Sequence, residues 1–239
     1  MDFSDRMAGY LESVAFQERL RKAALRPQPF VTISRQPGAG AAAAADAIAR
    51  EMQKGGEPAL RDWNILDRRL CETVAADPKL SVSMDSLMRE SFRSEFDDYI
   101  MHLVADDSPQ RSVIRKIFQT IRAAAGAGKV VIVGRAGACV TRQLPLGVHL
   151  RLVASKSWRL ANLMRQRGCD RHEAEKLMAE MEVSRRRLVA SCFQRDIEDP
   201  LLYDAVINAE RLPAEQIAAL AVELVRRKAA QKEPVAKIG

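Results

Sequence analysis

Short runs of β-branched and apolar residues alternate with longer amphipathic stretches along most of the chain. The runs at 31–33, 64–66, 129–133, 148–153 and 205–208 have the length and residue types of strands. The stretches between them predict a helix from about 41 onwards, helical structure over 68–110, and a helix that resumes there and ends at about 125. Three further helices are predicted over 155–167, 170–195 and 213–228. Strands that alternate with helical crossovers predict an α/β fold, a parallel sheet with helices on both faces. Ligands of such a sheet bind at the carboxyl ends of the strands.

The two ends of the chain fall outside this alternation. Residues 1 to about 26 place apolar side chains on one side of a helix, which Pro27 and Pro29 end. We expect residues 1–28 to form an extension that packs on the main domain, residues 29–230, or on a second subunit of a homo-oligomer. Residues 231–239 form a basic tail. We expect no membrane association, because the first residues lack the apolar core of a signal peptide and no segment approaches the roughly 20 apolar residues that span a bilayer.

Composition narrows the class of protein. Hydrophobic residues make up 47% of the 239 residues and aromatic residues 5%, which favours helices packed closely on a sheet over an all-β sandwich. The net charge of +7 indicates anionic partners, whether nucleotides, nucleic acid or membrane. The four cysteines stand far apart with no C-x-x-C pair and no cysteine/histidine cluster, which argues against a structural zinc site or a disulfide framework. We therefore expect a cytoplasmic protein.

The segment VTISRQPGAGAAAAADAIAR, residues 31–50, has the order strand, glycine loop, helix that is typical of a phosphate-binding loop. The usual pattern is G-x-x-x-x-G-K-[ST]. Aligned on Gly40, it has Arg35 in place of the first glycine, Ala41 in place of the lysine and Ala42 in place of the hydroxyl. The backbone part of a phosphate site is thus kept, while the cationic part is not, and Arg35 is the nearest charge. An ordinary turn before an alanine-packed helix fits the same residues.

Further candidates lie after the other strands and on the later helices. Arg135 follows the clearest strand in a glycine turn, where it either makes bidentate contacts with phosphate or is a surface loop residue. Asp67 ends the second strand, where it binds magnesium or a sugar hydroxyl, or caps a helix. The stretch 155–195 holds most of the net positive charge. Its arginines either close over a polyphosphate, for which the candidates are Arg185, Arg187 and Arg195, or belong to a solvated helix face.

Taken together, these segments resemble the cytidylate kinase-like family, a branch of the P-loop nucleoside monophosphate kinases, over about residues 30–228. The resemblance rests on TISRQPGAG, where the family typically has T-I-S-R-[EQ]-x-G-S-G-G-[RK], on ILD followed by a helix, and on VIVGRAG, which matches V-I-x-G-R-G. It rests most of all on SRRRLVASCFQRDIEDPLLYDAVINAERL, which is close to the family's S-R-x-x-Y-…-R-D-x-x-D-P-x-x-Y-D-x-x-[IL]-N-[TA]-x-x-L.

The resemblance implies a P-loop α/β fold with a five-stranded parallel sheet, a helical acceptor insertion at about 68–110 and an arginine-rich lid at about 155–196. It implies transfer of the γ-phosphoryl group of ATP, with Mg²⁺, to a nucleoside monophosphate such as CMP. By position, the phosphate loop consists of Ser34, Arg35, Gln36, Pro37, Gly38, Ala39, Gly40, Ala41 and Ala42. The catalytic candidates are Arg35, Arg135, Arg185 and Arg195, and the substrate-binding candidates are Asp67 and Arg187.

The sequence departs from the family at the loop, where Gly40-Ala41-Ala42 replaces G-G-[RK] and the basic residue is absent. Arg35 or a lid arginine is the expected substitute. The alternative is a catalytically silent relative that binds a nucleotide and acts as a regulatory or interaction module. A nucleic-acid binder fits the sequence less well, because aromatic residues do not interleave with the arginines.

Overall fold

The computed structural model describes residues 27–67 and 109–230. The expected N-terminal helix, the expected insertion up to residue 108 and the tail lie outside the described residues. None of the helices within the described ranges is long and apolar enough to cross a membrane.

The centre of the fold is a five-stranded sheet in the order β2-β3-β1-β4-β5, in which every pair of neighbours is parallel. This confirms the predicted α/β fold. The strands are β1 Phe30–Arg35, β2 Asn64–Leu66, β3 Val130–Val133, β4 Gly147–Val153 and β5 Ala205–Asn208. The central strand β1 lies between β3 and β4, with Val31 opposite Val131 on one side and Val148 on the other. The loop that follows β1 therefore lies at the middle of the carboxyl edge.

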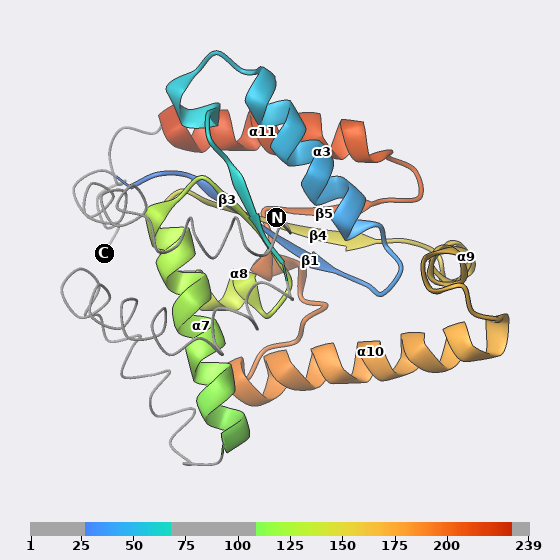
Figure 1. Cartoon of the computed structure of the whole chain (residues 1–239). Coiled ribbons are helices and arrows are strands. Elements are labelled where there is room, and N and C mark those ends of the chain that lie inside the picture. The colour runs from blue at the N-terminus through green and yellow to red at the C-terminus, as the bar shows by residue number, and fades with distance from the viewer. Residues whose placement is uncertain (1–26, 68–108, 231–239) are drawn as a thin grey trace, which may run out of the picture.

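Helices cover both faces of the sheet (Figure 1). One face carries α3 Ala41–Lys54 and α11 Ala214–Ala230, and the other carries α7 Pro109–Ala127, α8 Gly137–Val140 and α10 Arg171–Phe193. The helix α9, Lys156–Arg167, lies beyond the end of β4, and two short 3-10 turns occur at Pro58–Leu60 and Pro200–Leu202. The alanines of α3 bring its axis close to the sheet, since Ala44, Ala45 and Ala47 are buried together with Ile48 and Met52.

Several element ends differ by one or two residues from the sequence prediction, for local reasons. The strand β3 begins at Val130 because Lys129 has a φ of 54°, outside the β region. The helix α10 ends at Phe193, before the predicted end at 195, because Gln194 is left-handed, with a φ of 51°. Ser155 and Asp170 are the N-caps of α9 and α10, since their side chains accept hydrogen bonds from the Trp158 and Glu173 amides.

The partly buried ring of His149 in β4 predicts a loss of stability in mild acid. Its Nδ1 lies 2.8 Å from Thr32 Oγ1. Burial lowers the pKa of His149 from 6.5 to about 4, Asp204 opposes the shift and Lys228 adds to it. The folded pKa lies below the unfolded one. The contribution of neutral His149 to the free energy of unfolding is therefore complete above about pH 6.5 and is lost as the pH falls towards 4. We expect a loss of about 2 kcal/mol in the free energy of unfolding between pH 7 and pH 5.

Urea denaturation at both pH values checks this expectation, with His149→Gln as the comparison, because a glutamine does not titrate. The variant is expected to lose less stability than the parent between pH 7 and pH 5. An equal loss in the two proteins contradicts the assignment to His149.

Candidate active site

The loop between β1 and α3 has the backbone geometry of an anion site. Gly38 and Gly40 are both left-handed, with φ values of 77° and 75°. Gly40 is the N-cap of α3, no side chain caps the helix, and its first turn contains no acidic residue. The N-terminal end of α3 therefore presents N–H groups and the positive end of the helix dipole, neither of which is offset by a carboxylate of the first turn.

Helix α9 holds this loop in place. Asn162 Nδ2 donates to the Gly38 carbonyl over 3.0 Å, and Arg159 Nη1 lies 3.4 Å from the Pro37 carbonyl. Arg159 is 7% exposed and its Nη1 also pairs with Glu182 of α10 over 2.6 Å. The approach is so close that a Cβ on Gly38 would lie 2.3 Å from the Arg159 carbonyl oxygen. The loop, α9 and α10 are thus joined by side chains that the sequence analysis did not select.

A cavity of about 560 Å³ opens over the loop, and it brings together many of the predicted residues. We call it the loop cavity. Its lining contains Arg35, Gln36, Gly38, Ala39, Gly40, Ala41, Ala42, Ala45, Asp46, Ile65, Asp67, Val133, Leu163, Gln166, Arg167, Met181 and Arg185. Ala42 is exposed, so the position where the family has a basic residue faces open space. Ser34 and Pro37 lie outside this lining, although both belong to the predicted loop.

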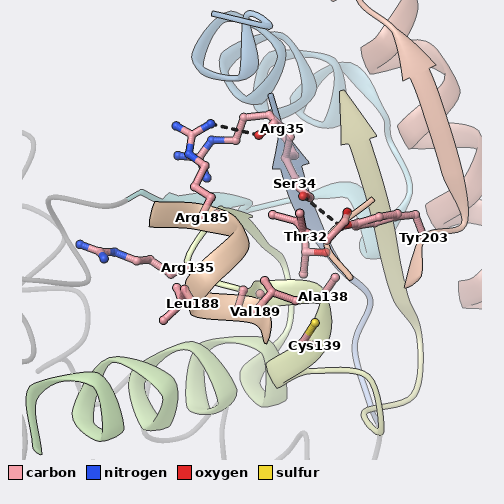
Figure 2. Close-up of a pocket in the computed structure, with 15 residues that line it drawn as sticks. Thr32, Ser34, Arg35, Arg135, Ala138, Cys139, Arg185, Leu188, Val189 and Tyr203 are labelled. Carbon is pink, nitrogen blue, oxygen red and sulfur yellow. Dashed lines mark hydrogen bonds between the residues drawn. The ribbon is translucent and has the colours of Figure 1, made fainter. Parts of the chain in front are cut away.

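Two arginines from distant parts of the chain meet at the end of β1. Arg185 Nη1 donates to the Arg35 carbonyl over 3.0 Å (Figure 2). Both side chains also line the loop cavity. The Arg35 guanidinium occupies the space above Gly134, where a Cβ would lie 1.6 Å from Arg35 Nη1. Gly134, in the turn after β3, therefore makes room for the arginine of β1. The fold thus brings Arg35 of the loop and Arg185 of α10 together.

Arg135 lies in the turn between β3 and α8, and both Arg135 and Ala136 are left-handed, with φ values of 50° and 56°. Arg135 lines a hollow of about 40 Å³ together with Arg35 and Arg185. Figure 2 shows its guanidinium directed away from Ser34 and Tyr203. Backbone strain in a non-glycine turn is common at ligand sites.

Two predicted arginines lie apart from this group. Arg187 and Arg195 are exposed, and neither lines the loop cavity or the hollow at Arg135. Residues two apart on a helix point to nearly opposite sides, which separates Arg187 from Arg185. Arg195 lies beyond the left-handed Gln194 that ends α10. Arg187 and Arg195 are therefore not gathered with Arg185 around these spaces, and their roles remain predictions.

The site contains residues that sequence reasoning did not find. Arg151 of β4 is 4% exposed, and its Nη1 donates to Ser34 Oγ over 3.1 Å. Tyr203 Oη lies 3.2 Å from Ser34 Oγ and 2.8 Å from the Ile197 carbonyl oxygen. Ser34 thus anchors the start of the loop to β4 and to the segment before β5. A charged residue inside an otherwise apolar strand was the available signal for Arg151.

The protonation states in this region disfavour a covalent nucleophile. Burial raises the pKa of the Cys139 thiol to about 11, although Arg142 and Arg195 oppose the shift. Burial also raises the pKa of Tyr203, against the hydrogen bond of Ser34 and the charge of Arg151. Both groups are neutral at pH 7. The charged and polar groups that this site offers a ligand are therefore its arginines and backbone amides.

The donor set of the loop cavity fits a magnesium ion that arrives with a phosphate ligand. Within the described ranges no three His, Cys, Asp or Glu side chains gather as a metal site of their own. Asp46 and Asp67 nevertheless line the loop cavity. Magnesium is usually held by one or two carboxylates together with substrate phosphates and water. The residues present agree with that mode of binding.

The fold and this site define an α/β protein with a large cavity at the carboxyl edge of a parallel sheet. The family model of the cytidylate kinase-like family matches residues 30–211, more than half of the chain. The chain therefore belongs to the cytidylate kinase-like family, whose members have a nucleotide kinase-like function.

The chain is also similar to one curated protein and to one solved structure. A cytidylate kinase of Thermoplasma volcanium is 31% identical over 74 residues, which are 31% of this chain and 39% of that kinase. The alignment thus spans less than half of the relative's length. The crystal structure of an uncharacterized protein from Eubacterium ventriosum superposes with a TM-score of 0.64 at 18% identity, over 84% of this chain and 99% of that one. This structure shares the fold.

Proposed function

We propose that the protein catalyses ATP-dependent phosphoryl transfer to a nucleoside monophosphate such as CMP, with the β1–α3 loop as its phosphate loop. The observation that carries the proposal is the loop cavity, where an uncapped helix N-terminus, two left-handed glycines and the side chains of Arg35 and Arg185 face the same space. Amides at a helix N-terminus bind phosphate without any side chain. The backbone therefore supplies the part of the site that the alanines leave intact.

Arg35 and Arg185 take the place of the absent loop cation in this proposal. Phosphoryl transfer concentrates negative charge on the oxygens around the transferred group, and positive charges fixed around them lower the barrier. Arg35 extends from the end of β1 and Arg185 from α10, and the hydrogen bond from Arg185 to the Arg35 carbonyl fixes the two relative to each other. In this proposal the same ligand is also contacted by Arg167, which lines the loop cavity, and by Arg135, which lines the neighbouring hollow.

Asp67 and Asp46 are the residues that would hold magnesium, directly or through water. When bound, the ion offsets phosphate charge. Asp67 lies at the end of β2, on the same carboxyl edge as the loop. The acceptor contacts belong, in this proposal, to the segment 68–108, outside the described residues.

The test is a steady-state phosphoryl-transfer assay with ATP, Mg²⁺ and a panel of nucleoside monophosphates, run beside thermal denaturation with ATP. Turnover of at least one monophosphate, with CMP expected as the best acceptor, supports the kinase proposal. If no acceptor is turned over while ATP still raises the melting temperature, the kinase proposal fails and a silent nucleotide-binding module stands. The specific observation that favours this second candidate is the pair Ala41 and Ala42 where a phosphate loop carries its cation and hydroxyl.

Ala42→Arg is expected to tighten ATP binding, because the exposed Ala42 lines the loop cavity and the new side chain restores a cation beside the phosphates. We expect about a tenfold lower Kd, since charge-assisted hydrogen bonds contribute roughly 1.5–3 kcal/mol. Isothermal titration calorimetry with ATP and Mg²⁺ measures it. Ala43→Arg is the matched control, because Ala43 is equally exposed but lies outside the cavity lining. An unchanged Kd for Ala42→Arg would count against phosphates at this loop.

A further inference from the structure

A second hollow lies behind the loop, between the carboxyl ends of β1 and β4 and helix α10. It measures about 220 Å³, and we call it the α10 hollow. Its lining contains Arg35, Gln36, Pro37, Arg151, Arg159, Glu182, Arg185, Arg186, Ile197 and Glu198. It shares Arg35, Gln36 and Arg185 with the loop cavity, but not the glycines or alanines at the start of α3. The two spaces thus meet at the paired arginines and are otherwise built from different residues.

Arg151 is the unusual member of this lining. It is 4% exposed, and an arginine is seldom buried so deeply unless a carboxylate pairs with it. Its partners within the described part of the chain are all neutral: the Ser34 hydroxyl and the ring of Tyr203, 5.6 Å from the guanidinium carbon. Burial raises the pKa of Tyr203, so the phenol gives Arg151 no negative charge at pH 7. Among the residues that the structure describes, no carboxylate therefore forms an ion pair with Arg151.

The carboxylates of the α10 hollow are already engaged with other arginines. Glu182 Oε1 pairs with Arg159 Nη1 over 2.6 Å, and Glu198 Oε1 pairs with Arg186 Nη2 over 3.3 Å. Neither carboxylate pairs with Arg151. Among the described residues, five guanidinium side chains and two carboxylates thus line the hollow. Such an excess of fixed positive charge around a water-accessible space attracts an anion.

We propose that the α10 hollow is a second anion site, in which Arg151 binds a phosphate group apart from the β1–α3 loop. A guanidinium matches two oxygens of a tetrahedral phosphate, and a buried one does so with little competition from water. The space suffices for a phosphate group with a few waters, since one water occupies about 30 Å³ of the liquid. The site goes beyond the proposed function, because it does not depend on whether the loop binds ATP. The phosphate is either free inorganic phosphate or the phosphate group of a monophosphate.

The first test is a titration of the whole protein with inorganic phosphate in the presence of saturating ATP and Mg²⁺, followed by thermal denaturation and calorimetry. Because ATP occupies the loop, phosphate is expected to raise the melting temperature further, with a Kd in the millimolar range or below. Arg151→Gln keeps a donor towards Ser34 but removes the charge, and it is expected to weaken phosphate binding at least tenfold; the Kd for ATP is measured beside it. Arg142→Gln is the matched control, because Arg142 is exposed and lines neither space.

Three results overturn the proposal: no phosphate binding up to about 10 mM, loss of phosphate binding when ATP is bound, or an unchanged phosphate Kd in Arg151→Gln. If Arg151→Gln does not fold, the phosphate Kd of Arg186→Glu tests the proposal instead. The Arg186 side chain is 56% exposed at the rim of the hollow, so its reversal spares the core, and an unchanged phosphate Kd there also overturns the proposal.

Competition identifies the source of the phosphate. If CMP displaces inorganic phosphate while cytidine does not, the group belongs to a nucleotide. If neither displaces it, the ligand is free phosphate. Both results support the anion site, and both are independent of the kinase assay, because turnover can be absent while phosphate still binds at Arg151.

Discussion

Gly38→Ala is expected to lower the melting temperature by roughly 5–15 °C and to abolish ATP binding, because the loop cannot keep its shape with a side chain at this position. Two costs add. A left-handed φ of 77° is unfavourable for alanine by roughly 1–2 kcal/mol. The new Cβ would also lie 2.3 Å from the Arg159 carbonyl oxygen, a backbone atom of α9, and such overpacking costs about 1–3 kcal/mol. Thermal denaturation with and without ATP measures both effects.

Gly168→Ala is the matched control for this variant. Gly168 is also left-handed, with a φ of 62°, but a Cβ there meets nothing within 4 Å. The control therefore carries the backbone cost without the steric one and is expected to lose only roughly 1–2 kcal/mol. Equal losses of stability in the two variants, or retained ATP binding in Gly38→Ala, would contradict the close contact between loop and α9.

Arg185→Ala is expected to reduce kcat/KM for phosphoryl transfer by at least about a hundredfold, by comparison with the loss of a single charge-stabilising donor in other enzymes. The reason is that Arg185 reaches the end of β1 and lines the loop cavity, the hollow at Arg135 and the α10 hollow. Its removal takes a positive charge from the point where the three spaces meet. Steady-state kinetics with the best acceptor of the panel measures the effect.

Arg171→Ala is the control for Arg185→Ala, because it removes an arginine from the same helix at an exposed position whose salt bridge is with Glu175. Surface pairs of this kind contribute little to stability. We expect near-normal kcat/KM in the control. A similar loss in both variants would assign the effect to the charge of α10 as a whole, against a specific role of Arg185.

The sequence was sufficient to predict the sheet and the loop. Strand β3 is short, apolar and bounded by glycines, and the glycines at 38 and 40 occupy the left-handed positions that their residue type suits. The family motifs named Arg35 and Arg185 as candidates, but the contact between them, 150 positions apart in the sequence, came only from the structure.

The side-chain contacts that could not be predicted depend on how helices and strands from distant parts of the sequence pack together. Asn162 and Arg159 face the loop because of the path by which β4 leads into α9, and no local pattern encodes that path. Arg151 was visible as a charge inside an apolar strand, but its neighbours Ser34 and Tyr203 come from distant segments. The separation of Arg187 from Arg185, by contrast, follows from helical geometry alone.

The attachment of the loop to α9 has a consequence for how a ligand is received. A free glycine loop samples many shapes and loses conformational entropy when it closes on phosphate, and this loss weakens binding. Here the carbonyls of Pro37 and Gly38 are already held by Arg159 and Asn162, and Glu182 holds Arg159 in turn. Most of that entropy is lost when the chain folds. A preorganised loop of this kind offsets part of the affinity that a missing cation would take away.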